Sequence, residues 1–179
     1  FLSREGISFT SFRPTYIYGP GNYNPIEKWF FDRITNNQKI PMPDDGQIIT
    51  QLGHVDDLAN AIQISILTEK AKNKIYNCSG NYGITVEGLI KLAYKVCGKT
   101  EKDYKIKSFE SSFLDPKARK LFPIRLDHFL TDISLIKKDL GWKPKYDLYD
   151  GLVDSFENDY KINCYREEVD FSNDSVLIS

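Results

Sequence analysis

The chain has 179 residues, of which 41% are hydrophobic and 13% aromatic, a composition that supports a packed core and excludes a disordered polypeptide. No apolar run approaches the roughly 18 residues that cross a bilayer, so we predict no membrane contact. The net charge of −1 conceals an asymmetry, because residues 91–145 carry an excess of seven basic side chains and residues 146–179 an excess of seven acidic ones. Such a separation can steer an anionic partner, although ordinary solvated faces also explain it.

The first segment predicts a buried strand that runs into a tight loop. Residues 7–18 are rich in β-branched and aromatic side chains, and Gly19-Pro20-Gly21 follows them directly. Pro25 opens a helix with apolar residues at three- and four-residue steps, and Asn36 and Asn37 close it. The carboxyl end of the strand is where open α/β sheets bind ligands.

The next elements alternate between turns, strands and helices. Residues 40–46 have the composition of a turn, residues 47–53 predict a short strand, and residues 55–69 predict a helix with acids in its first turn. We expect the inner face of this helix to consist of Val55, Leu58, Ala59, Ile62 and Ile66.

A second strand and helix follow. Residues 74–78 predict a strand, and Thr85 is expected to cap a helix that Gly98 ends, with Val86, Leu89, Ile90 and Ala93 facing inward. Residues 104–107 alternate as an exposed strand does, with both lysines on one face.

The last third is less regular. Residues 115–128 form a basic stretch without periodicity, Thr131 is expected to cap a short helix ending at Gly141, and residues 148–162 predict a longer helix. We predict one α/β unit over residues 1–163 and an extended or mobile acidic tail over residues 164–179. The cysteines Cys78, Cys97 and Cys164 have no metal-ligand spacing, so we expect reduced thiols and no metal site.

Several short motifs occur in an order that resembles the extended short-chain dehydrogenase/reductase superfamily, the NAD-dependent epimerases and dehydratases. They are Arg13-Pro14, Tyr18-Gly19-Pro20-Gly21, His54-Val55-Asp56-Asp57-Leu58 and Leu140-Gly141-Trp142-Lys143-Pro144. The resemblance implies the C-terminal part of a Rossmann-like α/β fold with its small substrate-type α/β subdomain. The Gly-rich cofactor loop and the catalytic Tyr-x-x-x-Lys pair of that superfamily are absent from the chain.

A narrower resemblance is to the chloroplast stem-loop-binding proteins and the related cyanobacterial mRNA-binding proteins. It is carried by Glu27-Lys28-Trp29-Phe30-Phe31-Asp32-Arg33-Ile34, by Ile75-Tyr76-Asn77-Cys78, by Asp115-Pro116-Lys117-Ala118 and by Phe122-Pro123-Ile124-Arg125 with His128-Phe129. It implies stem-loop mRNA as a partner, homo-oligomer or ribonucleoprotein association, a role in RNA stabilisation or endonucleolytic processing, and a location in the chloroplast stroma or a cyanobacterial cytoplasm.

The superfamily resemblance also implies site residues. Pro14, Thr15 and Tyr16 correspond to the strand end beside a nicotinamide, and the expected substrate pocket contains Arg13, Tyr18 and Asn22. We expect no cofactor to bind tightly to this chain alone, because the Gly-rich pyrophosphate loop is missing; NAD(P) remains open for the intact protein. The alternative to the RNA reading is therefore a fragment of an NAD(P)-dependent nucleotide-sugar epimerase or dehydratase.

The chain has two histidines. His54 precedes Asp56 and Asp57, and we interpret these acids as the first turn of a helix rather than as a metal or acid–base cluster. His128 lies in the basic stretch and is the one candidate for acid–base chemistry in RNA cleavage, against a packed or hydrogen-bonded role.

RNA affinity would come from basic side chains on phosphates, with aromatic side chains stacking on unpaired bases. The predicted RNA-binding residues are Lys105, Lys107, Lys117, Arg119, Lys120 and Arg125.

Overall fold

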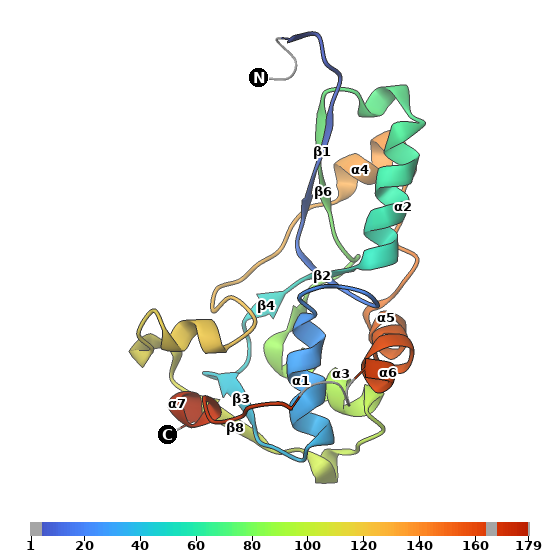
Figure 1. The fold of residues 1–179 in the computed structure, drawn as a ribbon. Coiled ribbons are helices and arrows are strands. Elements are labelled where there is room, and N and C mark those ends of the chain that lie inside the picture. Colours follow the sequence, from blue (N-terminus) through green and yellow to red (C-terminus); the bar gives the residue numbers. More distant parts are fainter. Residues whose placement is uncertain (1–4, 164–167, 179) are drawn as a thin grey trace.

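The predicted first strand is broken at Thr15, and the break separates an upper from a lower part of the molecule (Figure 1). The structure is a computed structural model that describes residues 5–163 and 168–178. Before the break, β1 (Thr10–Pro14) pairs in parallel with β6 (Lys74–Cys78). After it, β2 (Tyr16–Tyr18) pairs in parallel with β5 (Leu52–His54).

The upper part consists of β1 and β6 with helices packed beside them (Figure 1). These are α2 (Val55–Ile66), the 3-10 turn η2 (Glu69–Ala71) and α4 (Ser134–Leu140). Its core is a cluster of seven buried residues: Ala61, Ala71, Tyr76, Cys78, Ile133, Ile136 and Trp142.

The lower part holds the larger core, which α1, α3 and α5 share with two short strand pairs (Figure 1). β3 pairs in parallel with β8, and β4 pairs antiparallel with β7. The helices are α1 (Ile26–Thr35), α3 (Val86–Val96), α5 (Leu148–Ser155), α6 (Lys161–Asn163) and α7 (Asp174–Ile178). The strands are β3 (Ile40–Pro43), β4 (Ile49–Thr50), β7 (Ile84–Thr85) and β8 (Ile106–Phe109). The short turns are η3 (Glu101–Asp103), η4 (Ser111–Phe113), η5 (Ala118–Leu121) and the π-helical η6 (Phe156–Tyr160).

Several predicted elements are confirmed at the residue level. The strand over residues 74–78 has the expected bounds. The hydroxyl of Thr85 accepts the backbone N–H of Gly88 at 3.0 Å, which caps α3 as expected. Gly141 ends α4 in the left-handed conformation, with φ of 64°.

Other predictions about local structure were wrong. Ile40–Pro43 is a strand rather than a turn, because β8, distant in the sequence, pairs with it. The N-cap of α4 is Ile133 and not Thr131, and the Asp132 carboxylate next to it accepts the Ser134 N–H at 2.8 Å. The helix predicted over residues 148–162 is confirmed, but its middle, η6, is a π-helical turn, a feature common at functional sites.

The predicted inner face of α2 is buried only in part, since Leu58 is half-buried against the upper core while other residues of the apolar stripe are exposed. Ile62 is 42% and Ile66 77% exposed, whereas Asp57, Ala61 and Ser65 face the core. The interior accepts these polar groups because they are bonded: Asp57 takes the N–H of Lys145 at 2.7 Å. The C-terminal half of the predicted stripe, Ile62 and Ile66, is therefore exposed in this structure.

The acidic tail is folded where the structure describes it. Residues 168–178 include α7, whose Leu177 is 4% exposed within the lower core. Asp174 forms a buried ion pair with Arg33 of α1 at 2.5 Å. The expectation of an extended or mobile tail was thus wrong for Asp174–Ile178, while Cys164 lies outside the described residues.

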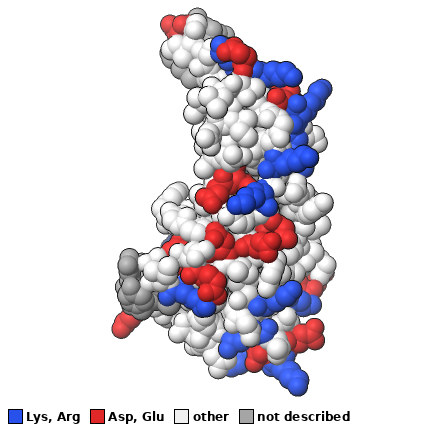
Figure 2. All heavy atoms as spheres, turned by 90° about the vertical axis from the view of Figure 1, so that its right-hand side faces the viewer, with Lys and Arg blue, Asp and Glu red and all other residues white. Residues whose placement is uncertain are grey.

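Charge does not form one continuous cationic flank. The basic segment over residues 91–145 is divided, because α4 lies beside β6 in the upper part whereas β8 and η5 contact α7 in the lower part. Figure 2 shows acidic side chains gathered across the middle of one face, at the level of α5, with basic side chains above and below. Within residues 5–163 and 168–178, no helix combines the length and apolar character that crossing a bilayer requires.

Candidate nucleic-acid interface

The carboxyl ends of β1 and β6 form the sheet edge at which α/β proteins commonly bind ligands. Pro14 is the last residue of β1, and it is exposed together with Arg13. Thr15 is held by the neighbouring strand: its N–H donates to the Cys78 carbonyl at 3.3 Å, and its hydroxyl bonds to the Ser79 hydroxyl. This edge is built from residues that the sequence singled out, but the Thr15 polar groups are already engaged.

Tyr16 belongs to a second cluster, with Arg125 and Phe129. The N–H of Arg125 donates to the Tyr16 hydroxyl at 2.8 Å. The Tyr16 ring meets Phe129 edge-on at 5.4 Å, and the Arg125 guanidinium lies 4.4 Å from the centroid of Phe129. Tyr16, which was expected at the cofactor, and Arg125, which was expected at RNA, are therefore neighbours. Together with Phe129 they form a patch with an exposed cation and two half-buried aromatic rings.

His128 is exposed next to this patch and has a structural bond. Its Nδ1 accepts the N–H of Ile49 at 3.0 Å, which places the proton of the neutral ring on Nε2. Asp127 pairs with Arg119 at 3.1 Å. His54 lies in the interior on another element, so the two histidines do not form a paired acid–base arrangement.

Tyr18 is buried, with 2% exposure, and its hydroxyl packs against Gly151 of α5. Burial, reinforced by nearby carboxylates, raises the pKa of the Tyr18 hydroxyl. Its ring lies edge-on to His54 at 5.3 Å. With Tyr146 these side chains line a small internal cavity, so Tyr18 contributes to the interior more than to an open rim.

Asn22 closes the loop after β2. Its side-chain amide donates to the Ile17 carbonyl at 2.7 Å, and its carbonyl oxygen accepts the Asn24 N–H at 3.3 Å. The side chain also lines a cavity of about 320 Å³ next to Glu27 and Asp159. Asn22 therefore lines a pocket between the loop after β2 and the helical segment α5–η6, and its assignment to a substrate pocket stays a prediction.

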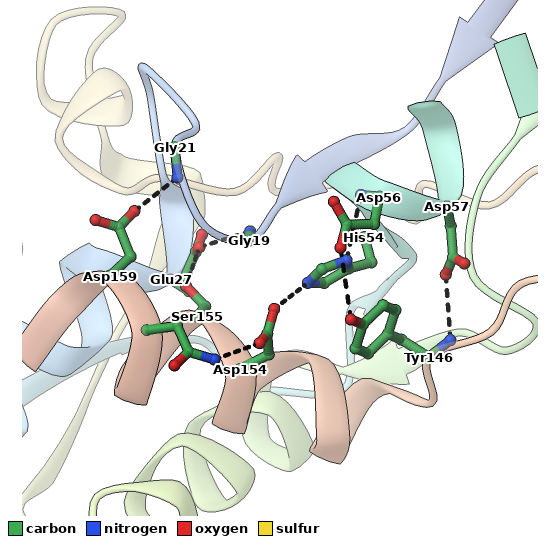
Figure 3. Close-up of polar contacts among 11 residues, drawn as sticks. Gly19, Gly21, Glu27, His54, Asp56, Asp57, Tyr146, Asp154, Ser155 and Asp159 are labelled. Carbon is green, nitrogen blue, oxygen red and sulfur yellow. Dashed lines mark hydrogen bonds and ion pairs between the residues drawn. The ribbon is translucent and has the colours of Figure 1, made fainter. Parts of the chain in front are cut away.

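Glu27 is a buried carboxylic acid that the sequence analysis did not single out. It is 3% exposed, and its Oε1 accepts the Gly19 N–H at 2.9 Å and the Ser155 hydroxyl at 2.6 Å (Figure 3). Its Oε2 has no hydrogen-bond partner among the described residues. Burial raises the pKa of Glu27. In the sequence it was indistinguishable from an ordinary first-turn acid of a helix.

His54 caps α2 from inside the protein. Its Nδ1 accepts the Asp56 N–H at 3.3 Å, and its ring stacks on Tyr146 at 3.9 Å (Figure 3). Its Nε2 lies 3.2 Å from Asp154, within ion-pair distance although the ring N–H is not well aligned with that oxygen. Burial lowers the pKa of His54 despite the surrounding carboxylates.

The side chains of His54, Asp56 and Asp154 place potential ligand atoms within 4.8 Å of one another in the described part of the chain. The hydrogen bonds favour a helix cap over a metal centre. Nδ1 of His54 already accepts a backbone N–H, so Nε2 of the neutral ring carries a proton and faces Asp154. Neither ring nitrogen then offers a free lone pair to a metal ion.

The predicted RNA-binding residues occupy two regions that both contact α7. Lys105 precedes β8 and Lys107 lies within it, and both are exposed. Lys117, Arg119 and Lys120 are exposed at η5, which also contacts α7. Arg125 belongs to the Tyr16 cluster described above. The sequence analysis missed Lys39 and Phe171, which lie beside Lys105 and Lys107; only the three-dimensional pairing of β3 with β8 brings Lys39 there.

Comparison with known proteins agrees with this architecture. Residues 2–79 match the model of the NAD dependent epimerase/dehydratase family. Chloroplast stem-loop binding protein of 41 kDa b from Arabidopsis thaliana is 42% identical over 178 residues, covering 99% of this chain and 47% of that protein. Probable GDP-L-fucose synthase 1 from Oryza sativa subsp. japonica is 27% identical over 164 residues, covering 86% of this chain and 45% of that protein.

Solved structures show the same fold. An epimerase from Methanothermobacter thermautotrophicus has a TM-score of 0.76 at 16% identity, covering 93% of this chain and 47% of its own. UDP-glucose 4-epimerase from Thermotoga maritima has a TM-score of 0.69 at 24% identity, covering 93% of this chain and 49% of its own. The chain therefore belongs to the NAD-dependent epimerase/dehydratase family, the extended short-chain dehydrogenases/reductases, and has their Rossmann-like α/β fold. It spans about half the length of the curated relatives it matches.

Proposed function

We propose that this chain is part of an RNA-binding member of the family, which binds stem-loop RNA and acts in RNA stabilisation or endonucleolytic processing. The observation that carries the proposal is the 42% identity to a stem-loop binding protein over 99% of the chain, against 27% for a nucleotide-sugar enzyme. The same relative is chloroplastic, which supports the chloroplast stroma as the location; a cyanobacterial cytoplasm is the alternative location in this proposal. Association into homo-oligomers or ribonucleoprotein particles belongs to the same proposal.

The basic surface at η5 supplies a physical basis for RNA binding. The Arg119–Asp127 pair is exposed on both sides, and such pairs contribute only about 0–1 kcal/mol. An RNA phosphate can therefore replace Asp127 at little cost. Arg125 stands nearby with Phe129 and Tyr16, which offers an aromatic surface next to a cation. Phosphates would be neutralised at η5 and by the Arg125 guanidinium beside the aromatic cluster.

Binding should be measured by fluorescence anisotropy with a labelled stem-loop RNA over a series of salt concentrations. The proposal expects affinity to fall steeply as salt rises, because each neutralised phosphate releases counterions. The variant with Lys117, Arg119 and Lys120 replaced by Ala should bind more weakly and with a shallower salt slope, while its circular dichroism spectrum stays unchanged. Affinity that does not change with salt would refute phosphate contacts as the basis of binding.

A second function, NAD(P)-dependent nucleotide-sugar chemistry, is favoured by the family match and by the ligand-type sheet edge at Pro14 and Thr15. The chain contains neither a Gly-rich dinucleotide loop nor a Tyr-x-x-x-Lys pair, so this chemistry would depend on residues outside it. Two measurements on the longest natural form of the protein decide between RNA binding and nucleotide-sugar chemistry. The first is a fluorescence titration of NADH, and the second is an activity assay with UDP- and GDP-sugars. Turnover of a nucleotide sugar would overturn the RNA proposal as the main function.

RNA cleavage would centre on His128, the predicted acid–base candidate. Its exposed ring lies beside the Arg125 cluster, but the Ile49 N–H occupies its Nδ1. A His128→Asn variant tests the role, because Asn can still accept the Ile49 N–H. Loss of cleavage with RNA affinity retained would support catalysis by His128, and unchanged cleavage would eliminate it.

A further inference from the structure

A groove on the lower part of the molecule lies between the start of β8, the loop before β3 and the C-terminal segment with α7. Its volume is about 500 Å³. Its basic wall consists of Lys39, Lys105 and Lys107, and Phe171 lines it from the C-terminal segment. The groove exists because Ile40 pairs with Ile106, which brings the two lysine-bearing segments together.

The groove is positively charged. Lys39, Lys105 and Lys107 are exposed, and within the described residues none of the three forms an ion pair with an acid. The ammonium of Lys105 donates to the Asn37 carbonyl at 3.3 Å, which holds it at the edge of the groove.

The carboxylate of Asp174, which also lines the groove, does not cancel this charge. Arg33 neutralises it with two hydrogen bonds, from Nε at 3.0 Å and from Nη2 at 2.5 Å. A ligand in the groove therefore meets three uncompensated ammonium groups.

The other walls fit nucleotide bases. Phe171 offers a half-buried ring, and Ile106 and Ile178 add apolar surface. The side-chain amides of Asn37 and Gln38 can hydrogen-bond to base edges. Cations for phosphates, an aromatic face for stacking and amides for base edges together form the combination that recognises unpaired nucleotides. A fully paired helix presents its phosphates but not the faces of its bases.

We propose that this groove holds unpaired nucleotides of a stem-loop RNA, with phosphates on Lys39, Lys105 and Lys107 and a base on Phe171. The inference rests on the proposed function and assigns the loop of the RNA to a surface distinct from η5. Lys105 and Lys107 are two residues apart on one extended segment, roughly 7 Å along it, so they face the groove as a pair that can contact successive phosphates of an extended strand.

The test compares two RNAs and two charge-matched variants. One RNA is a stem-loop with an unpaired loop, and the other is the same stem as a blunt duplex. The groove variant replaces Lys39, Lys105 and Lys107 by Ala. The control replaces Lys70, Lys138 and Lys143, three exposed lysines of the upper part, and removes the same net charge.

For wild type, the inference expects tighter binding to the stem-loop than to the duplex. The groove variant should lose at least about tenfold in stem-loop affinity, and its salt slope should become shallower by about 2, the value for three single-strand phosphate contacts. The control should remain within about twofold. Phe171→Leu, which keeps apolar packing but removes the stacking face, should lower stem-loop affinity by about 5- to 150-fold and leave duplex affinity unchanged.

The outcomes separate the two proposals. If wild type binds the stem-loop and the groove variant matches the control, the groove inference fails while RNA binding stands. If the groove variant loses duplex affinity as strongly as stem-loop affinity, the assignment to unpaired nucleotides fails. If wild type binds neither RNA, the proposed function itself fails. The melting temperatures of all variants, measured alongside, must lie close to that of wild type. Leucine is chosen at position 171 because it keeps the apolar packing and so avoids misfolding of the C-terminal segment.

Discussion

The pair formed by Arg33 and Asp174 joins the first helix to the last one, and its removal is the sharpest test of the C-terminal packing. Both residues are buried, with 6% and 8% exposure. The guanidinium also donates to the Trp29 carbonyl at 2.8 Å and lies 3.5 Å from the Trp29 ring centroid. Arg33 is thus fixed in place whether or not Asp174 is present.

Replacing Asp174 by Asn keeps the shape but removes the counter-charge. If α7 stays docked, the buried guanidinium loses its partner, and breaking a buried pair from one side costs about 3–5 kcal/mol. If α7 detaches, Arg33 becomes hydrated and the loss equals only the docking free energy of α7. We therefore expect the free energy of unfolding to fall by up to about 3–5 kcal/mol, or about 2–4 °C of melting temperature for each kcal/mol.

Urea denaturation with hydrogen exchange of α7 checks this expectation. The control is Glu168→Gln, an exposed acid on the same segment, which should change the unfolding free energy by less than about 0.5 kcal/mol. The double variant Arg33→Met with Asp174→Leu should recover most of the loss, because an apolar pair needs no counter-charge. An Asp174→Asn protein as stable as wild type, with α7 amides equally protected, would refute the reasoning.

Three further predictions concern the interior. Burial raises the folded-state pKa of Glu27, so the free energy of unfolding of wild type falls as pH rises from about 4.5 through that pKa. Glu27→Gln lacks this loss. In urea denaturation, the free energy of unfolding of the variant relative to wild type should therefore be higher at pH 8 than at pH 4. Burial lowers the pKa of His54, so the contribution of neutral His54 to the free energy of unfolding is complete above about pH 6.5 and is lost as pH falls through the folded-state pKa. His54→Asn should flatten the dependence of the unfolding free energy on pH in that window, and an unchanged dependence would contradict the prediction. Gly151→Ala should destabilise by about 1–3 kcal/mol in spite of alanine's helix propensity, because the new Cβ would overlap the Tyr18 hydroxyl; Tyr18→Phe should relieve part of the cost in thermal melts.

The elements that the sequence predicts well are those whose signals are local. Thr85 and Gly98 bracket α3, and the inward residues repeat at helical spacing, so propensity, cap and periodicity agree. The strand over residues 74–78 is likewise an uninterrupted β-prone run between turns. These signals need no knowledge of the rest of the chain.

The elements predicted wrongly depend on distant partners. Ile40–Pro43 looks like a turn because it contains two prolines, yet its strand forms on pairing with β8. On α2 the predicted inward residues Ile62 and Ile66 are exposed, because Trp142 donates to the Asp57 carbonyl at 3.1 Å and anchors the polar side instead. No local pattern reveals such a contact across 85 positions.

The candidate site shows the same division. Tyr16 and Arg125 were each predicted from motifs, but for different ligands, and only the structure shows that they touch. The sequence around Glu27 has no distinguishing signal, because the burial of this first-turn acid depends on two distant segments. These are the loop after β2, through Gly19, and the end of α5, through Ser155. Lys39 was overlooked since it lies far outside the basic segment.

Charge counted along the sequence also misjudges the field that a polyanion meets. The acidic tail suggests a repulsive C-terminus, yet Arg33 neutralises Asp174, and α7 lines the basic groove and also contacts η5. Conversely, several residues of the basic segment are engaged elsewhere: Lys91 pairs with Glu87 at 2.7 Å, and Lys137 donates to Asn81 at 2.8 Å. The cationic surface available to RNA is therefore smaller than the sequence suggests and depends on a docked tail. Phe171 and Ile178 line the groove from the C-terminal segment, which the Arg33–Asp174 pair fastens to α1. Asp174→Asn should therefore weaken RNA binding through the groove if α7 detaches, even though the substitution removes a negative side chain.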